Sequence, residues 1–206
     1  MSKDWTGNSR SYASTLGARN FAEEEREVND YYATDPRALE ILLERLKQDN
    51  IELSSEILEC ACGEGHLSKV LLANWYDVYS TDLIDRGFGE PYVDFLKTKI
   101  DWGGDIVTNP PYKYGKEFVE HSMELLQKDR YCIMFLKLQF LEGKARKQLF
   151  EKYPPKYVYV FSQRQRCAMN GNFEKYANEG NTHGAVAYCW YIWQKGFNGE
   201  PIIRWI

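Results

Sequence analysis

The sequence predicts an α/β fold with a mostly parallel sheet and helices on both of its faces. Short segments at residues 56–62, 77–83 and 105–108 are predicted strands, and each has a glycine or a polar residue at or just after its end. Apolar residues at helical spacing follow the first and the third of these segments. In open α/β sheets, ligands bind at the carboxyl ends of the strands, so we expect the functional site there.

Length and composition limit the class of protein. With 206 residues, we expect a flexible N-terminal arm over residues 1–28 and a single domain over residues 29–206. No apolar run approaches the roughly 20 residues of a membrane span, and the N-terminus lacks the apolar region of a signal peptide, so we expect a cytoplasmic protein. No Cys-x-x-Cys pair occurs among the five cysteines, and we expect no metal site.

Charge is distributed unevenly along the chain. The formal net charge is −4, but residues 137–206 hold 11 Lys and Arg against 5 Asp and Glu. A basic second half could face the phosphates of a nucleic acid, and the alternative is a chance segregation of surface charge.

The segment that ends the third predicted strand carries the most specific signal. Asp105–Thr108 is followed by Asn109, Pro110, Pro111 and Tyr112. Two prolines cannot continue a strand, so they present Asn109 and Tyr112 on a stiff turn. The side-chain oxygen of Asn109 and the carbonyl of Pro110 can accept both N–H groups of a planar amine, and Tyr112 can stack on a planar ring. The alternative is a plain proline-rich turn.

Asn-Pro-Pro-Tyr resembles the catalytic motif of S-adenosylmethionine (SAM)-dependent amino-methyltransferases. These include adenine-N6 DNA methyltransferases, some ribosomal RNA methyltransferases and release-factor glutamine methyltransferases. The order of motifs and the tail resemble small phage and prophage DNA adenine-N6 methyltransferases over about Asn29 to Ile206. The resemblance implies SAM as cofactor and a Rossmann-like class I methyltransferase fold, with a seven-stranded sheet that is reduced in size. It gives catalytic roles to Asn109, Pro110, Pro111 and Tyr112.

A Gly-x-Gly turn lies between the first predicted strand and a helix that carries Leu67, Val70, Leu71 and Leu72. Glycines there allow a sharp turn and the close approach of a ligand. The turn resembles methyltransferase motif I, which makes cofactor-binding candidates of Glu59, Ala61, Gly63 and Gly65. Glu59 stands where Asp is common. The longer Gly-x-Gly-x-x-Gly of nicotinamide enzymes is absent, because residue 68 is Ser.

Two carboxylates follow the glycine turn. Asp82 ends the second predicted strand about 20 residues later, where a carboxylate can accept from both ribose hydroxyls of an adenosyl group. Asp85 is a lesser alternative. The segment around Asp94 and Phe95 resembles the family's third motif, in which the Asp accepts from the cofactor adenine and the aromatic ring packs on it. The short connection from Asp82 to Asp105 predicts a reduced edge of the sheet.

Ahead of the glycine turn, Pro36 and a series of leucines predict a helix from Pro36 to Gln48, with Thr34 or Asp35 as N-cap. Tyr32 and Thr34 resemble the family's N-terminal motif, which lines the methionine end of SAM. The alternative is an ordinary capped helix.

The C-terminal half predicts helices at 115–128 and 142–152, and strands at 131–136, 156–162, 185–194 and 202–206. Lys137 and Gln139 are placed at the mouth of the site. Residues 163–183 are basic, aromatic and rich in Gly and Asn, which is typical of a substrate loop. The substrate-binding candidates are Lys137, Arg164, Arg166, Phe173, Lys175 and Tyr176. The alternative is a hairpin without such a role. We expect Trp190, Tyr191 and Trp193 in the core.

We therefore expect methyl transfer from SAM to the N6 amine of adenine in DNA, with the base flipped out of the duplex. RNA adenine or guanine and protein glutamine are alternative substrates, because each carries an amino group on a planar frame. A different reading is a non-catalytic module that binds SAM or nucleic acid. The chain has no room for a large target-recognition domain, so the loop at 163–183, the N-terminal arm or a second subunit would supply specificity.

Overall fold

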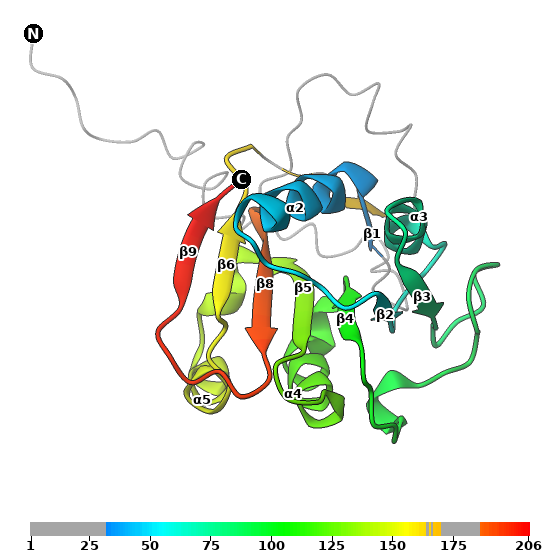
Figure 1. Ribbon diagram of the computed structural model, residues 1–206. Coiled ribbons are helices and arrows are strands. Elements are labelled where there is room, and N and C mark those ends of the chain that lie inside the picture. The colour runs from blue at the N-terminus through cyan, green and yellow to red at the C-terminus, as the bar shows by residue number, and fades with distance from the viewer. Residues whose placement is uncertain (1–31, 164, 166, 170–185) are drawn as a thin grey trace, which may run out of the picture.

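The computed structural model describes residues 32–163, 165, 167–169 and 186–206 (Figure 1). Within them, seven strands form one sheet in the order β3-β2-β4-β5-β8-β6-β9. Their bounds are β2 Glu56–Glu59, β3 Asp77–Ser80, β4 Asp105–Thr108, β5 Tyr131–Lys137, β6 Tyr157–Val160, β8 Tyr188–Gln194 and β9 Ile202–Trp205. Neighbours are parallel except where β8 pairs antiparallel with β5 and β6. The predicted mostly parallel sheet is confirmed.

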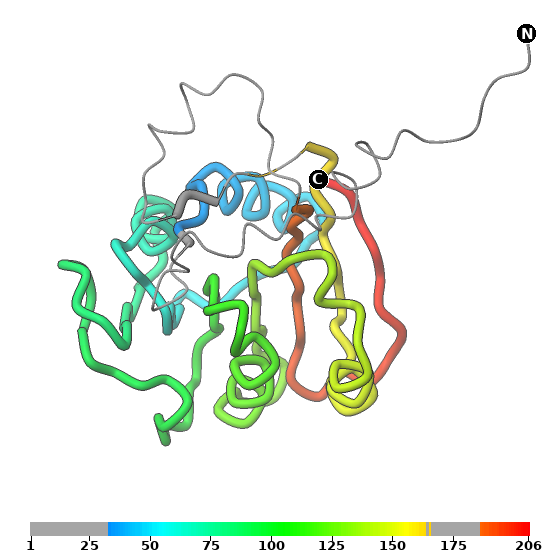
Figure 2. The backbone as a smooth tube through the Cα atoms, turned by 180° about the vertical axis from the view of Figure 1, so that it is seen from behind, coloured from blue at the N-terminus to red at the C-terminus, as the bar shows by residue number. Residues whose placement is uncertain are grey.

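In the described part of the chain, two helices cover each face of the sheet. Helices α2 (Pro36–Gln48) and α3 (His66–Ala73) pack on one face, against Ile57, Val107, Ile133 and other strand residues. Helices α4 (Gly115–Leu125) and α5 (Lys144–Lys152) pack on the opposite face, where Leu58, Ile106 and Met134 point. Figure 1 shows α2 in front of the sheet, and the reverse view shows α4 and α5 in front (Figure 2). Neighbouring strand residues thus enter two separate cores, as the alternation of side chains requires.

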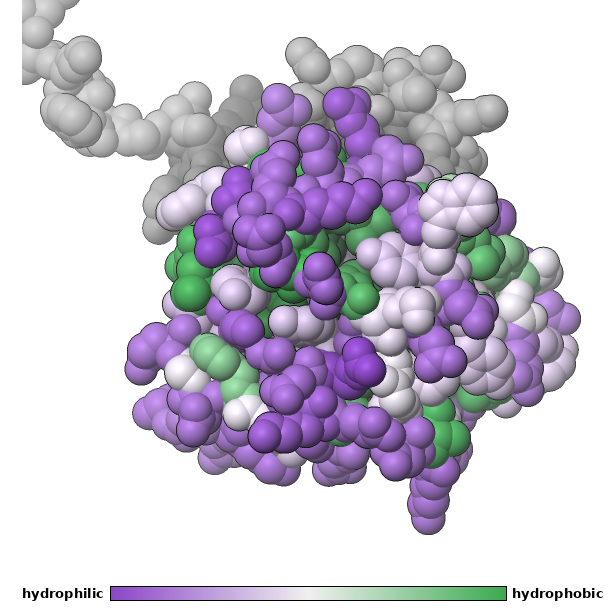
Figure 3. Space-filling view, viewed as in Figure 1, coloured by the Kyte–Doolittle hydropathy of each residue, from purple (hydrophilic) through white to green (hydrophobic). Residues whose placement is uncertain are grey.

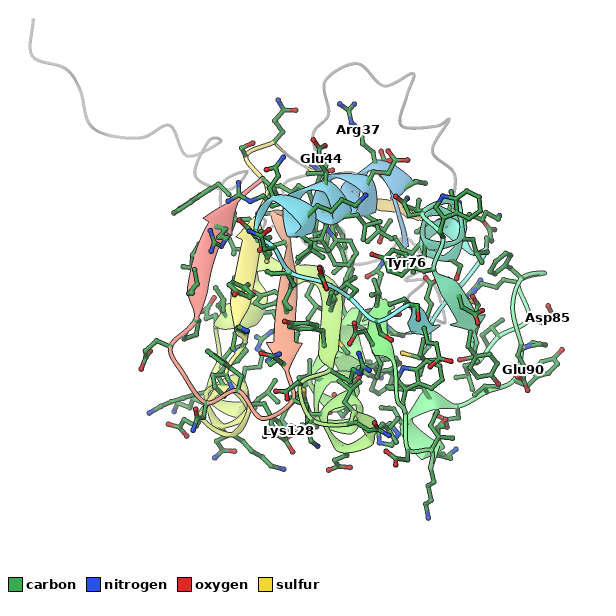
Figure 4. All side chains as sticks on the ribbon, viewed as in Figure 1. Arg37, Glu44, Tyr76, Asp85, Glu90 and Lys128 are labelled. Carbon is green, nitrogen blue, oxygen red and sulfur yellow. The ribbon has the colours of Figure 1, made fainter. Side chains whose placement is uncertain are left out.

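Helix α2 has the predicted bounds. Pro36 is its first residue, and the Asp35 side chain caps it by accepting from the Arg37 amide at 3.0 Å. Its buried face consists of Ala38, Leu39, Leu42, Leu43 and Leu46. Arg37 and Glu44 point away from the sheet (Figure 4), and the outer surface of the helix is polar (Figure 3).

Several boundaries differ from the prediction by a few residues. Strand β2 ends at Glu59, so Cys60 and Cys62 are buried in the turn after it rather than in the strand. Helix α4 ends at Leu125 instead of residue 128, and β8 begins at Tyr188 instead of residue 185. The aromatic residues of β8 are core residues as expected, since Trp190, Tyr191 and Trp193 are fully buried.

The reduced edge of the sheet is confirmed. Residues 81–104, all of them described, contain only the short 3-10 helix η1 (Phe95–Lys97) and two isolated bridges. Strand β9 instead adds a strand at the opposite edge, parallel to β6. The sheet therefore reaches seven strands with its extra strand on the side away from the glycine turn.

A second, two-stranded sheet corrects part of the predicted substrate loop. Strand β1 (Tyr32–Thr34) pairs antiparallel with β7 (Cys167–Met169), so residues 167–169 are a strand and not loop. This pairing joins the segment before α2 to the segment after β6. The predicted arm over residues 1–28 and the candidates Arg164, Arg166, Phe173, Lys175 and Tyr176 lie outside the described residues.

No helix in the described part of the chain is both long and apolar enough to cross a bilayer.

Strand β4 is fixed at its start by a buried carboxylate. Asp105 is only 1 % exposed, and its two oxygens accept from the backbone amides of Ser54 at 2.6 Å and Tyr131 at 2.7 Å. Those amides belong to the segments that lead into the neighbouring strands β2 and β5. Asp105 therefore ties the starts of three adjacent strands together.

We expect Asp105→Ala to lower the free energy of unfolding by about 2–4 kcal/mol, because it leaves two partly buried amides without their acceptor. Urea unfolding measures this change. Asp101→Ala, at an exposed position in the same segment, is the matched control and should change stability by less than about 0.5 kcal/mol. Equal stabilities of the two variants would contradict the role given to Asp105.

Candidate active site

A cavity of about 1270 Å³ opens at the carboxyl ends of β2, β3, β4 and β5. The turns that follow these four strands all contribute to its lining, through residues such as Ala61, Asp82, Asn109 and Lys137. Strands β3 and β4 lie on opposite sides of β2, so the order of the strands reverses at this point. A reversal of this kind is where open α/β sheets bind their ligands.

Ala61, Cys62 and His66, on either side of the glycine turn after β2, line one end of the cavity, whereas Gly63 and Gly65 are not among its lining residues. Gly65 has a φ of +77° and precedes α3, and a Cβ placed there would lie 2.5 Å from the Phe88 ring. Glycine is therefore required both by the backbone angle and by the ring. The Gly63 amide donates to Asp82 Oδ2 at 2.8 Å, which holds the carboxylate against the turn.

Asp82 lies two residues beyond the end of β3 and lines the cavity. Its second oxygen accepts from the Ile84 amide at 2.8 Å. Asp85, the lesser alternative, is exposed and accepts from the Gly87 amide at 3.0 Å (Figure 4), and it is not among the cavity-lining residues. The structure therefore favours Asp82 over Asp85 as the carboxylate of this site.

Glu59 is the most deeply buried carboxyl group of the cavity wall, at 1 % exposure. The Ser68 hydroxyl of α3 donates to it, and Ser68 Oγ lies 2.6 Å from Ser80 Oγ at the end of β3. Burial raises the pKa of Glu59 to about 8, and the nearby Asp82 carboxylate adds to the rise. Glu59 therefore keeps its proton near neutral pH in the absence of a cationic ligand.

Asp94 and Phe95 line the cavity from the reduced edge of the sheet. Asp94 caps η1 by accepting from the Leu96 amide at 3.2 Å, and it pairs with Lys97 at 2.7 Å. Phe95 is 4 % exposed, and its ring centroid lies 5.0 Å from that of Phe118. The two residues thus offer a carboxylate beside a fixed aromatic ring.

Thr34 lines the cavity from β1 and is 2 % exposed. Its hydroxyl oxygen is buried without a hydrogen-bond partner among the residues that the structure describes. A buried hydroxyl in this state suits a polar ligand. The side chain of Tyr32 lies outside the described residues, so the role expected of it stays a prediction.

Asn109, Pro110, Pro111 and Tyr112 all line the cavity directly after β4. The strand stops at Thr108, and Tyr112 begins the short 3-10 helix η2 (Tyr112–Tyr114) that leads into α4. The side-chain oxygen of Asn109 is shielded from solvent. The Tyr112 ring lies 5.8 Å from the Tyr188 ring, which in turn stacks on Phe135 at 5.1 Å. An aromatic stack therefore supports the tetrad from β5 and β8.

Sequence reasoning missed further cavity residues, among them Ile84, Arg86, Phe140 and Arg146. Ile84 and Arg86 follow Asp82 closely, so their place could have been inferred from that of Asp82. Phe140 lies in the 3-10 helix η3 (Leu138–Leu141), and Arg146 in α5. Arg146 is one of several basic residues of α5, and its position in the cavity wall depends on tertiary packing.

No protein-family model and no curated protein sequence matches this chain. Solved structures do match its fold. A protein from Listeria monocytogenes assigned as a class I SAM-dependent methyltransferase superposes with a TM-score of 0.57 at 12% identity, over 95% of this chain and 70% of that chain. A protein from Pyrococcus horikoshii assigned as an RNA methyltransferase gives 0.57 at 12% identity, over 93% of this chain and 100% of that chain.

A third similar structure is the modification subunit assigned to a type I restriction enzyme of Vibrio vulnificus, with a TM-score of 0.55 at 10% identity. The match covers 96% of this chain, which spans only 51% of that subunit. At identities this low, the superpositions establish the fold alone. The chain has the Rossmann-like fold of class I methyltransferases.

The raised pKa of Glu59 predicts a pH-dependent stability. The unfolded chain loses the Glu59 proton near its ordinary pKa of 4.5, whereas the folded chain keeps it to about pH 8. The contribution of the Glu59 carboxyl group to the free energy of unfolding is therefore complete below about pH 4.5, and it is lost as the pH rises to about 8. We expect wild-type stability in urea to fall by a few kcal/mol more than that of Glu59→Gln between pH 5 and 8.

The exposed Glu52, just before β2, supplies the matched variant Glu52→Gln, which should keep the wild-type pH dependence. An identical pH dependence in Glu59→Gln and wild type would show that Glu59 ionises normally in the folded chain.

Proposed function

We propose that this protein is a SAM-dependent methyltransferase that acts on the exocyclic N6 amine of adenine in DNA. The observation that carries the proposal is the position of Asn109. It follows a fully buried strand, lies in the wall of the cavity and is succeeded by two prolines that restrict its backbone. An amide oxygen in that place suits recognition of an amino group.

The lining of the cavity fits the cofactor that the fold implies. Asp82 offers a carboxylate for ribose hydroxyls, and Phe95 offers an apolar surface for adenine. The buried Thr34 hydroxyl provides a further polar contact. Glu59 would ionise beside the ammonium group of the methionine moiety. SAM supplies an activated methyl group on a sulfonium centre.

The chain's own residues position the accepting amine. Asn109 Oδ1 and the Pro110 carbonyl accept its two N–H groups, which directs the nitrogen lone pair away from both oxygens. Tyr112 orients the plane of the base, and its ring is itself supported by Tyr188. A strong base is not required before attack, because the proton can leave after the methyl group has been transferred. The proposed rate enhancement is therefore mainly one of orientation.

The same amide chemistry would serve an amine in RNA or a protein glutamine. Proteins with a similar fold are assigned to different classes: the Pyrococcus protein is assigned as an RNA methyltransferase, and the Vibrio protein as the modification subunit of a restriction enzyme. We favour DNA because of the motif order, and we place target recognition in segments outside the described residues or in a second subunit. RNA and protein are tested as alternative substrates in the same experiment.

The proposal is tested by methyl transfer from radiolabelled SAM to duplex DNA, single-stranded DNA, RNA and a release factor. We expect label in DNA, reduced by about 100-fold or more in Asn109→Ala because the amine is no longer oriented. Asn198→Ala, at an exposed position before β9, is the matched control and should retain activity. SAM binding, measured by calorimetry, should survive both substitutions.

Full activity of Asn109→Ala would exclude the proposed mechanism. Label only in RNA or in the release factor would keep the mechanism and replace the substrate. SAM binding without transfer to any polymer would favour the non-catalytic binding module.

The cofactor site gives an independent prediction. Asp82→Asn should weaken SAM binding by about tenfold or more, because a charged acceptor is lost. The matched control is Asp85→Asn, which changes an exposed carboxylate of the same loop that lies outside the cavity. Calorimetric titration of both variants with SAM decides the matter. Equal affinities of the two variants for SAM would show that Asp82 does not bind the cofactor.

A further inference from the structure

Two cations line the cavity on the side of β4 that lies away from the glycine turn. Lys137 is the last residue of β5, and Arg146 lies in the first turn of α5. The carboxyl groups of the wall belong to the other side, since Glu59 and Asp82 follow β2 and β3. Arg86 and Lys97 also line that side, so its charge is mixed, whereas the charged residues that β5 and α5 contribute to the cavity are both positive.

Each of the two cations lies over an aromatic ring of the same cavity. Lys137 Nζ is 4.8 Å from the centroid of the Tyr112 ring, and Arg146 Cζ is 5.3 Å from that of Phe140. Phe140 is only 5 % exposed, so its ring is a fixed platform. A cation–π contact holds a cation in place without cancelling its charge.

Neither cation has an acidic partner among the residues that the structure describes. Other lysines of the described chain do have one: Lys97 pairs with Asp94, Lys116 with Glu120 and Lys147 with Glu151. The last pair is on α5 itself, so carboxylate partners are available on this helix. Lys137 and Arg146 thus keep their positive charge directed to the cavity.

The chain around Arg146 accommodates its guanidinium group. Gly143 precedes α5 with a φ of +116°, and a Cβ at this position would lie 3.2 Å from Arg146 Nη2. Arg146 is half-buried, whereas Lys144, Ala145, Lys147 and Gln148 around it are exposed. The arginine is therefore packed into the rim of the cavity, unlike its neighbours on the helix.

We propose that Arg146, together with Lys137, binds a backbone phosphate of the nucleic acid next to the nucleotide that is methylated. This inference rests on the proposed function and deepens it, because it makes a polynucleotide the substrate class. A polynucleotide brings a phosphate with every nucleotide, whereas a glutamine side chain brings no charge. The guanidinium fork of arginine matches the geometry of phosphate oxygens.

The test is fluorescence anisotropy with a short fluorescein-labelled single-stranded oligodeoxynucleotide, titrated with the full chain at several NaCl concentrations. At low salt we expect Arg146→Gln to bind about tenfold more weakly than wild type. The slope of log Kd against log salt should fall by about 0.7, the value for one lost phosphate contact with a single strand. Arg146→Lys should keep the slope, since the charge remains.

Lys147→Gln is the matched control, because it removes one positive charge from the same helix at a position outside the cavity. It should leave the slope and the affinity close to wild type. If Arg146→Gln and Lys147→Gln weaken binding equally, the effect is one of general charge and the inference is wrong.

The binding assay is independent of catalysis, so the two proposals can fail separately. Methylation of DNA by wild type, with an unchanged salt slope in Arg146→Gln, would overturn the phosphate site and leave the function intact. A lower slope without methyl transfer to any substrate would support the phosphate site and overturn the catalytic proposal. If Arg146→Gln and Lys137→Gln weaken SAM binding in calorimetry but not oligonucleotide binding, the cations serve the cofactor and the inference is wrong.

Discussion

The geometry of the cavity depends on where strand β4 stops. All four residues of β4 are buried, and Asp105 fixes the start of the strand to both of its neighbours. The two prolines after Asn109 cannot donate to a further ladder, so pairing ends there. Asn109 consequently lies where the turns of the neighbouring strands meet around one cavity. One additional residue in the strand would direct the side chain that follows it to the opposite face of the sheet.

The charged side chains of the cavity differ on either side of this point. Glu59, Asp82 and Asp94 line one part together with Arg86 and Lys97, and Lys137 and Arg146 line the other. A nucleoside with an ammonium group is complementary to the first part, and a phosphate backbone to the second. The raised pKa of Glu59 fits this division, because a buried carboxyl beside Asp82 stays neutral until a cation arrives. The negative overall charge of the chain is therefore a poor guide to what the cavity binds.

Local signals predicted much of this arrangement. Helix α2 has its predicted ends because Asp35, Pro36 and a series of leucines all specify the same helix. Ala61, Asp82 and the Asn109–Tyr112 tetrad line one cavity, since each lies at the carboxyl end of a predicted strand. The pairing of β1 with β7 joins three-residue segments more than a hundred positions apart, and no local pattern encodes it. Arg146 was equally hidden, because only its packing on Phe140 distinguishes it from the other basic residues of α5.

The role proposed for Asn109 is to present the N6 amine of adenine for methylation. Its most direct test is to incubate the protein with unlabelled SAM and duplex DNA, digest the DNA to nucleosides and identify the methylated nucleoside by mass spectrometry. We expect N6-methyldeoxyadenosine in the wild-type reaction and its absence after reaction with Asn109→Ala. A methyl group on any other atom of the DNA, or an equal amount of N6-methyldeoxyadenosine from Asn109→Ala, would contradict it.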